Sequence, residues 1–228
     1  LVASPPCQGH SSLNNRTRRK DEKNLLYLDP IAVGIALNVP IIIIENVKGV
    51  LSSKIDVVNI SKSILIKHGY HIDDFNIESD KYGVSQSRER HFLIASKFGI
   101  LERKKQTEEL KLNPISIKKL FSSMKNVNGS QNETYTVMAD LSKENKARVE
   151  YLFDNDVYEL PNHQRPDCHK NGHSYPSVYG RINPDEVSST ITSGFYSPGR
   201  GRYVHPYERR ALNAREASQI QGIPDNFW

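Results

Sequence analysis

Apolar and polar positions alternate along the first hundred residues in a way that predicts strands and helices in turn. Residues 41–44 are all isoleucine and follow Pro40, which predicts a central parallel strand buried on both faces. Residues 24–37 carry apolar side chains at helical spacing, and residues 56–68 predict a second helix that Gly69 would close. Three further segments read as strands: residues 1–3, 70–77 and 91–95. The order β, α, β, α, β, β predicts an α/β domain with a mostly parallel sheet.

The pattern changes after about residue 99. Residues 102–150 are charged and polar with few strong periodic signals, and residues 160–204 are rich in Gly, Pro, His, Tyr and Ser, which is typical of loop-rich recognition regions. Regular secondary structure is predicted again at residues 213–216, whose Asn-Ala-Arg-Glu sequence has the form of a capping box at the start of a short helix. We therefore predict an α/β lobe at residues 1–100 and a smaller, loop-rich lobe at residues 101–228.

Composition narrows the function classes. A hydrophobic share of 37% and a mean hydropathy of −0.59 fit a soluble globular protein. The apolar run at residues 39–44 is too short to span a membrane, and we expect no signal peptide and no membrane partner. The two cysteines are far apart and make no disulfide framework, so we expect a reducing, cytoplasmic location.

A net charge of +5 permits a polyanionic partner without demanding one. Basic residues gather at positions 16–20 and again near the end of the chain. The second group consists of Arg200, Arg202, Arg209 and Arg210. Residues 194–202 add glycines and aromatic residues between arginines, which suits either contact with a nucleic-acid backbone or a flexible surface loop.

Three polar motifs lie where the predicted strands begin or end. They are Pro6-Cys7-Gln8, Glu45-Asn46-Val47 and Gln86-Ser87-Arg88-Glu89-Arg90. Open α/β sheets place ligands at one end of the sheet, so we expect a thiol, a carboxylate and two guanidinium groups to converge there. Each motif alone also fits a plain structural role: a buried cysteine, a loop carboxylate or a surface ion pair. Together they predict a site in which Cys7 is a nucleophile.

These motifs, in this order, resemble the DNA cytosine-5 methyltransferases. The resemblance extends to residues 82–90 and, downstream, to residues 189–192, 209–217 and 220–225. It covers residues 1–99 and about 173–228, and it leaves the middle unmatched. It implies an incomplete Rossmann-like, S-adenosylmethionine-dependent catalytic lobe at residues 1–100 and a target-recognition lobe at residues 101–228. It also implies a bacterial or phage protein of a restriction–modification system, associated with the nucleoid.

The resemblance implies a role for each residue of the motifs. The reaction would be methyl transfer from S-adenosylmethionine to C5 of a cytosine flipped out of double-stranded DNA. Cys7 would add to C6, Glu45 would hold N3, and Arg90, with Arg88, would stabilise the charge on the ring. Pro6 is the expected cofactor contact. The expected DNA contacts are Gln8, Ser11 and Ser12 after the cysteine, and Arg200, Arg202, Arg209 and Arg210 in the second lobe.

The sequence also departs from the family pattern. Residues 1–228 contain neither a Phe-x-Gly-x-Gly segment for the cofactor nor the Gly-Asn-x-Val segment expected after residue 225. We therefore expect a fragment, a truncated gene product or half of a split enzyme, with a complementary chain that carries the cofactor motifs. The alternative function is a non-catalytic DNA-binding subunit, or a split-enzyme subunit that needs a partner to bind cofactor.

A metal site is not expected. His163, Cys168, His169 and His173 lie close together, but their spacing matches no paired zinc motif. The sequence does not indicate which bases the second lobe would read.

Overall fold

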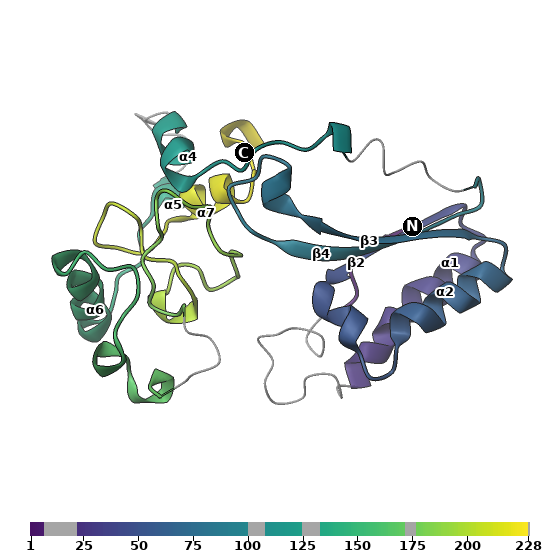
Figure 1. Ribbon diagram of the computed structural model, residues 1–228, viewed down its shortest axis with the longest axis horizontal. Helices are drawn as coiled ribbons and strands as arrows, with labels where there is room; N and C mark the ends of the chain where they lie inside the picture. The colour runs from purple at the N-terminus through teal and green to yellow at the C-terminus, as the bar shows by residue number, and fades with distance from the viewer. Residues whose placement is uncertain (7–21, 100–107, 125–132, 172–176, 228) are drawn as a thin grey trace. The chain divides into compact units, whose positions relative to one another are not determined.

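A computed structural model describes residues 1–6, 22–99, 108–124, 133–171 and 177–227. The chain divides into two compact units (Figure 1). The first unit comprises Leu1–Glu78 and Glu89–Leu110, and the second comprises Ser79–Arg88 and Lys111–Trp228. The short segment Ser79–Arg88, which the sequence pattern joins to the first hundred residues, thus packs with the later part of the chain.

The first unit is built on a four-stranded mixed sheet. Its strands are β1 (Val2–Ala3), β2 (Ile41–Val47), β3 (His71–Glu78) and β4 (Glu89–Ser96), in the order β1-β2-β4-β3. β1 and β2 are parallel, whereas β4 is antiparallel to both β2 and β3. The α/β prediction is confirmed, but the expectation of a mostly parallel sheet is wrong for these strands. Only ten residues join β3 to β4, and a parallel connection needs a longer crossover.

Two helices cover one face of this sheet (Figure 1). They are α1 (Asp29–Ala36) and α2 (Val57–Lys67), with 3₁₀-helices at Glu22–Tyr27 and Lys48–Ser52. The helix predicted for residues 24–37 is divided in two, because Pro30 suits the first turn of a helix and not its interior. Gly69, at φ +80°, follows the end of α2 as predicted.

The core of the first unit lies between the sheet and the two helices. Ile42, Ile44 and Leu93 are buried there together with Ile31 of α1 and Leu65 of α2. The burial of β2 alternates along the strand, so the expectation that it is buried on both faces is wrong. β2 lies between a parallel and an antiparallel neighbour, and α1 and α2 cover one face of the sheet, so only that face of β2 needs to be fully apolar.

The second unit has short helices and many irregular segments. Its helices are α4 (Ile117–Ser123), α5 (Glu133–Thr136), α6 (Lys143–Asp154) and α7 (Ala214–Ile220). α7 begins with the predicted capping box, in which Asn213 and Glu216 exchange side-chain and backbone hydrogen bonds. α4 and α6 fall within the region that showed few periodic signals, although Ser116 and Ser142 cap their first turns.

Apolar side chains from distant parts of the chain hold the second unit together. One cluster joins Ile117, Ile182, Leu212 and Ile220, and another joins Leu152 of α6 to residues near position 204. Three backbone hydrogen bonds between described residues tie Ser79–Arg88 to the rest of this unit: Ser87 N to Ser188 O (2.8 Å), Ser188 N to Ser85 O (2.9 Å) and Leu112 N to Lys81 O (2.9 Å). Among the described residues, no helix has the length and apolar character needed to cross a membrane.

Candidate active site

The carboxylate of Glu45 joins two of the three predicted motifs. Ser4, three residues before Cys7, donates a hydrogen bond from Oγ to Glu45 Oε2 over 2.6 Å. Arg90 Nε lies 2.9 Å from the other oxygen, Oε1, in an ion pair. Glu45 and Arg90 are mostly buried, with side chains 25% and 18% exposed. Both carboxylate oxygens are therefore fixed by donors from other strands or their ends.

The register of the sheet explains why these residues meet. Ala3 pairs with Ile44 in the parallel ladder, so Ser4 comes next beside Glu45. In the antiparallel ladder Glu45 pairs with Phe92 and Val47 with Arg90, which makes Glu45 and Arg90 diagonal neighbours on one face. Long side chains at diagonal positions reach each other across a pair of strands.

Asn46 anchors the segment that leads to Cys7. Its side chain is buried and donates from Nδ2 to the carbonyl oxygen of Pro5 over 3.1 Å. The backbone N–H of Val47 donates to Asn46 Oδ1 over 2.9 Å. Asn46 and Ser4 are positioning residues that the sequence analysis did not single out. The sequence signal for them is their position: Asn46 lies inside the second motif, and Ser4 lies two residues before the first.

Several predicted site residues lie outside the part of the chain that the structure describes. These residues are Cys7, Gln8, Ser11 and Ser12, together with the basic residues at positions 16–20. Their roles as nucleophile and DNA contacts remain predictions. Pro6, the expected cofactor contact, is described and exposed.

The third motif is divided between the two units. Arg90 belongs to the first unit and lies beside Glu45, whereas Arg88 belongs to the second. Gln86 is buried in the second unit, where its Oε1 accepts a hydrogen bond from the backbone N–H of Ile191 (3.0 Å). The backbone N–H of Arg88 donates to Ser79 Oγ (3.1 Å). Gln86 therefore has a structural role within the second unit, which differs from the surface ion pair considered as the plain alternative for this motif.

Two of the four arginines predicted to contact DNA have partners inside the fold. Arg210 forms two hydrogen bonds to Glu216 (2.8 and 2.6 Å) and one to Glu208 (2.7 Å). Arg202 pairs with Glu159 and donates to the carbonyl oxygen of Tyr158 (3.0 Å). Both guanidinium groups therefore have carboxylate partners within the second unit, and their contact with phosphates remains a prediction.

The other two arginines are accessible. Arg209 is half exposed and lies 2.7 Å from Asp154 in a surface ion pair. Arg200 is exposed and, within the described ranges, has no carboxylate partner. Tyr196, four residues earlier in the same loop, is also exposed.

The loop that carries Tyr196 and Arg200 is tightly packed. A Cβ atom at Gly194 would lie 2.7 Å from Arg200 Cγ, and one at Gly199 would lie 2.9 Å from Tyr179 Oη. A Cβ atom at Gly201 would lie 2.5 Å from the ring of Tyr203. Atoms this close cannot be accommodated without a shift, so the glycines permit a compact loop rather than providing flexibility. The contact of residues 194–202 with a nucleic-acid backbone remains a prediction.

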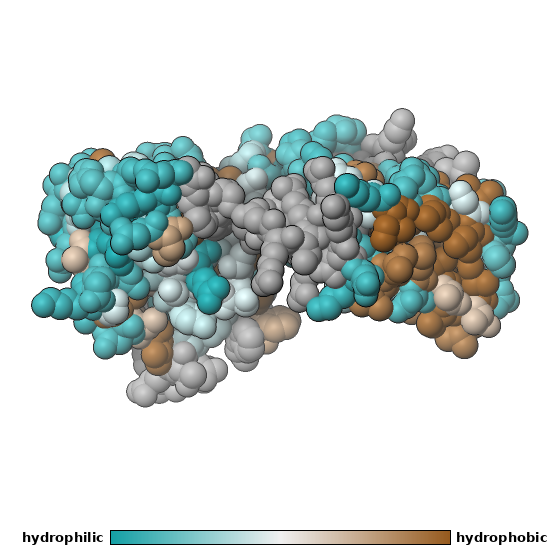
Figure 2. All heavy atoms as spheres, turned by 90° about the horizontal axis from the view of Figure 1, so that it is seen from below, coloured by the Kyte–Doolittle hydropathy of each residue, from teal (hydrophilic) through white to brown (hydrophobic). Residues whose placement is uncertain are grey.

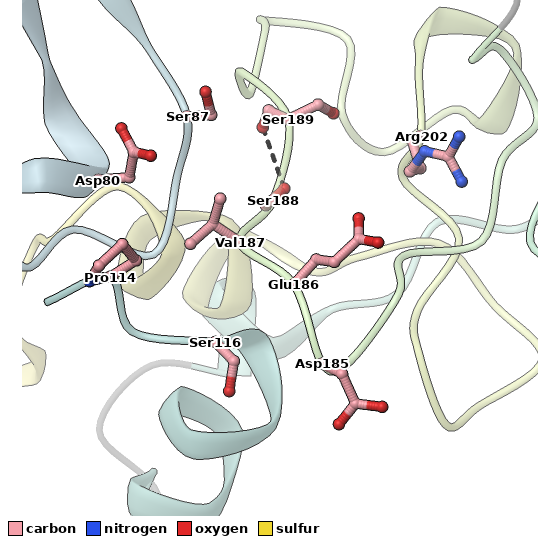
Figure 3. Close-up of a pocket in the computed structure, with 10 residues that line it drawn as sticks. All are labelled: Asp80, Ser87, Pro114, Ser116, Asp185, Glu186, Val187, Ser188, Ser189 and Arg202. Atoms are coloured by element: carbon pink, nitrogen blue, oxygen red, sulfur yellow. Dashed lines mark hydrogen bonds between the residues drawn. The ribbon is translucent and has the colours of Figure 1, made fainter.

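A cavity of about 540 Å³ lies within the second unit (Figure 3). Its lining includes three acidic side chains, Asp80, Asp185 and Glu186, and the hydroxyl-bearing residues Ser87 and Ser116. The lining also includes one cation, Arg202, which pairs with Glu159, so carboxylates predominate and do not suit the phosphates of DNA.

The described residues also provide no metal centre. Cys168 Sγ lies 3.0 Å from Nδ1 of the adjacent His169, on the surface. No group of three metal-ligating side chains occurs among the described residues, and His173 lies outside them.

Among the described histidines, His205 has the pKa that is shifted furthest from its ordinary value. It is buried, and its Nδ1 accepts hydrogen bonds from the backbone N–H groups of Tyr207 (3.1 Å) and Glu208 (2.9 Å). Burial lowers its pKa to about 4, against the opposing effect of the nearby Glu216 carboxylate. His205 is therefore a neutral structural residue.

The family model of the C-5 cytosine-specific DNA methylases matches residues 1–228 of this chain. The chain belongs to this family. It is 40% identical over 228 residues to the type II methyltransferase M1.BsuMI of Bacillus subtilis, and 29% identical over 241 residues to the type II methylase M.HgiDII of Herpetosiphon aurantiacus. The whole chain is covered in both cases, but only 53% and 66% of those proteins. The chain thus spans about half the length of the Bacillus relative.

Solved structures support the same fold. The methyltransferase EhMeth of Entamoeba histolytica gives a TM-score of 0.55 at 17% identity, covering 100% of this chain and 66% of that one. The Dnmt2 methyltransferase of S. pombe also gives 0.55, at 16% identity, covering 98% of this chain and 65% of that one. These comparisons confirm the predicted family and the Rossmann-like α/β fold.

Proposed function

We propose that this chain carries the catalytic thiol, the catalytic carboxyl group and the DNA-recognition part of a DNA cytosine-5 methyltransferase. The observation that carries the proposal is the Glu45 carboxylate, held between Ser4 and Arg90 at the end of strands β1 and β2. Ser4 leads directly to Pro5-Pro6-Cys7, so the carboxyl group is fixed next to the segment that bears the thiol.

Addition of the Cys7 thiolate to C6 is the first step of this chemistry. A new S–C6 bond forms, and the electron pair of the C5=C6 bond moves into the ring, where negative charge gathers towards N3 and O2. A proton from Glu45 to N3 neutralises that charge and leaves an enamine whose C5 is nucleophilic. Arg90 holds the carboxyl group in place and adds positive charge beside the ring. Because this geometry needs access to both faces of the base, the cytosine must leave the duplex.

The described residues do not by themselves fit S-adenosylmethionine, the methyl donor implied by the family. At the ends of β1 and β2 the polar side chains bond to one another: Ser4 to Glu45, Glu45 to Arg90, and Asn46 to Pro5 and Val47. None of these groups is directed to a nucleoside. The proposal therefore assigns cofactor binding to polypeptide in addition to these residues, with Pro6 at the edge of that site.

Contact with double-stranded DNA is assigned to the compact loop of the second unit. Arg200 can bind a phosphate and Tyr196 can stack on an exposed base or pack on a sugar. Arg209 adds a second accessible charge, whose pair with Asp154 is at the surface and therefore weak. Gln8, Ser11 and Ser12 are proposed to contact DNA from the segment after the thiol.

Exchange of the C5 hydrogen tests the thiol without the cofactor. Addition at C6 makes C5 basic, so a cytosine tritiated at C5 releases tritium to water when the adduct forms and reverses. The chain should release tritium from a duplex of random sequence, and Cys7→Ser should reduce the rate at least 100-fold. Cys168→Ser, the matched control at the other cysteine, should not change it. Equal release by Cys7→Ser would remove the proposed nucleophile.

The alternative of a non-catalytic subunit is favoured by one observation, the absence of cofactor-directed groups among the described residues. It predicts DNA binding without tritium release, and no methyl transfer when any cofactor-binding partner is added.

A further inference from the structure

The hydroxyl group of Tyr203 lies at the centre of a hydrogen-bond network inside the second unit. Its O–H donates to the carbonyl oxygen of Thr190 over 3.1 Å. Its oxygen accepts from the backbone N–H of Thr192 (3.2 Å) and lies 2.9 Å from the side-chain hydroxyl of the same residue. The Tyr203 side chain is fully buried, whereas the face of the second unit that Figure 2 shows is mainly hydrophilic. The phenol thus fixes the chain at Thr190 and Thr192 from within the core.

The segment that Tyr203 fixes holds the third sequence motif in turn. The hydroxyl group of Thr190 donates to the carbonyl oxygen of Ser87 (2.9 Å), and the N–H of Ile191 donates to Oε1 of Gln86 (3.0 Å). The side chains of Ser87 and Ser188 lie on facing segments in Figure 3, where the N–H of Ser87 donates to Ser188 O (2.8 Å). Both backbone groups of Ser87 are therefore bonded to this segment.

The next residue, Arg88, is held from the other side. The N–H of Arg88 donates to Ser79 Oγ (3.1 Å), and the N–H of Ser79 donates to Arg88 O (3.1 Å). All four backbone polar groups of Ser87 and Arg88 thus have partners within the second unit. A backbone bound at every polar group presents its side chain from one defined position.

The aromatic ring of Tyr203 has a separate function. A Cβ atom at Gly201 would lie 2.5 Å from this ring, so the ring packs directly on the backbone of the loop that carries Arg200. The ring therefore supports the loop that is proposed to contact DNA. The hydroxyl group instead acts on Thr190 and, through it, on the segment that leads to Arg88.

We infer that Tyr203 is a positioning residue for methyl transfer, whose hydroxyl group holds Arg88 in a fixed place relative to the loop of Arg200. The catalytic consequence rests on the proposed function and on the role predicted for Arg88 in it. The positioning itself rests only on the hydrogen bonds. A phosphate contact and a charge beside the reacting ring act together only if their separation is fixed, and a displacement of about 1 Å costs about 100-fold in rate.

Tyr203→Phe removes the hydroxyl group and keeps the ring. Tritium release from C5 at saturating duplex should fall about 10- to 100-fold, because Thr190 and then Ser87 lose their fixed positions. Affinity for the duplex, measured by fluorescence anisotropy, should change less than about twofold, since the ring still supports Gly201.

Thr190→Val removes the bond to Ser87 directly and should slow tritium release by a similar factor. The double variant of Tyr203→Phe and Thr190→Val should be no slower than the slower single variant, because both changes break the same path to Arg88. Two independent losses that add would contradict this path.

Hydrogen exchange of single amides gives a readout that does not depend on catalysis. In Tyr203→Phe the Ser87 amide should exchange at least about tenfold faster, because the segment that binds it is less firmly held. The Arg200 amide, which donates to Ser197 O over 3.0 Å inside the loop, should exchange at the parent rate.

Tyr70→Phe is the matched control for lost stability. Tyr70 is also buried, and its hydroxyl group donates to the carbonyl oxygen of Val39 (2.6 Å) in the first unit. Its removal costs the fold a comparable buried hydrogen bond, yet it should alter neither tritium release nor exchange at the Ser87 amide.

The outcomes separate this inference from the proposed function. Unchanged exchange at the Ser87 amide in Tyr203→Phe would overturn the positioning. Faster exchange with an undiminished rate of tritium release, or an equal effect of Tyr70→Phe, would reduce Tyr203 to a structural residue and overturn its part in the reaction. Faster exchange in a chain whose parent releases no tritium would support the positioning and count against the proposed function.

Discussion

Glu45 and Arg90 form a diagonal pair across neighbouring antiparallel strands, with Arg90 Nε 2.9 Å from Glu45 Oε1. Arg90 also donates from Nη1 to the carbonyl oxygen of Glu89 over 2.7 Å, so its guanidinium group is held at two points. Ser4 fixes the second oxygen of Glu45. The carboxyl group thus has a defined orientation without any ligand, which is the preorganisation that electrostatic catalysis requires.

Glu45→Gln should impair chemistry far more than DNA binding. The amide keeps the shape and can still bond to Ser4, but it cannot deliver a proton to N3. General acid–base groups contribute about 10²- to 10⁴-fold to a rate, and tritium release from C5 should fall by that factor. Binding of the same duplex, measured by fluorescence anisotropy, should change less than threefold. A parallel loss of binding would contradict the assignment.

Arg200→Met should weaken DNA binding without changing stability. The variant removes the exposed guanidinium group and its phosphate contact, and it keeps the Cβ and Cγ atoms that lie close to Gly194. The slope of log affinity against log salt should become shallower by about 0.9. An unchanged slope would exclude Arg200 from the interface, and the thermal midpoint is the control for folding.

Arg210→Met should destabilise the second unit instead. Arg210 and Glu216 have side chains only 12% and 9% exposed, and removal of the cation leaves a buried carboxylate without its partner. Loss of one member of a buried pair costs about 3–5 kcal/mol, to be measured by urea unfolding. The matched control is Arg209→Met, whose pair with Asp154 is half exposed and should contribute less than about 1 kcal/mol.

Acid should destabilise the second unit through His205. Its pKa is about 4 in the folded chain and 6.5 in the absence of the fold, so between these values the unfolded chain binds a proton that the folded chain does not. The free energy of unfolding is therefore highest above about pH 6.5 and decreases as the pH falls towards 4. The total decrease is about 3 kcal/mol, at 1.36 kcal/mol per pKa unit.

Unfolding in urea at a series of pH values from 4 to 7.5 checks this dependence. His205→Asn keeps an acceptor for the N–H groups of Tyr207 and Glu208 but does not titrate, and it should reduce the slope by one proton. Some slope should remain, since burial also lowers the pKa of His91. An unchanged slope would show that His205 is not the responsible group.

The sequence by itself determined the family, the α/β class and the chemistry available at the ends of the strands. These features depend on local order along the chain, such as the four isoleucines that lead to Glu45 and the Asn213–Glu216 capping box. A capping box needs only residues three apart, and a buried strand needs only a run of apolar side chains. Such signals can be recognised from the local sequence without knowledge of the rest of the fold.

The tertiary structure alone decided which charged groups meet. In the sequence Arg200, Arg202 and Arg210 are equivalent positive charges, but Arg202 reaches Glu159 and Arg210 reaches Glu216, which leaves Arg200 accessible. Likewise, Glu45 obtains its partners from Ser4 and Arg90, more than forty residues away on either side. A charge is neutralised by whatever the fold brings within a few ångströms, and strand register and packing between distant segments determine that neighbour.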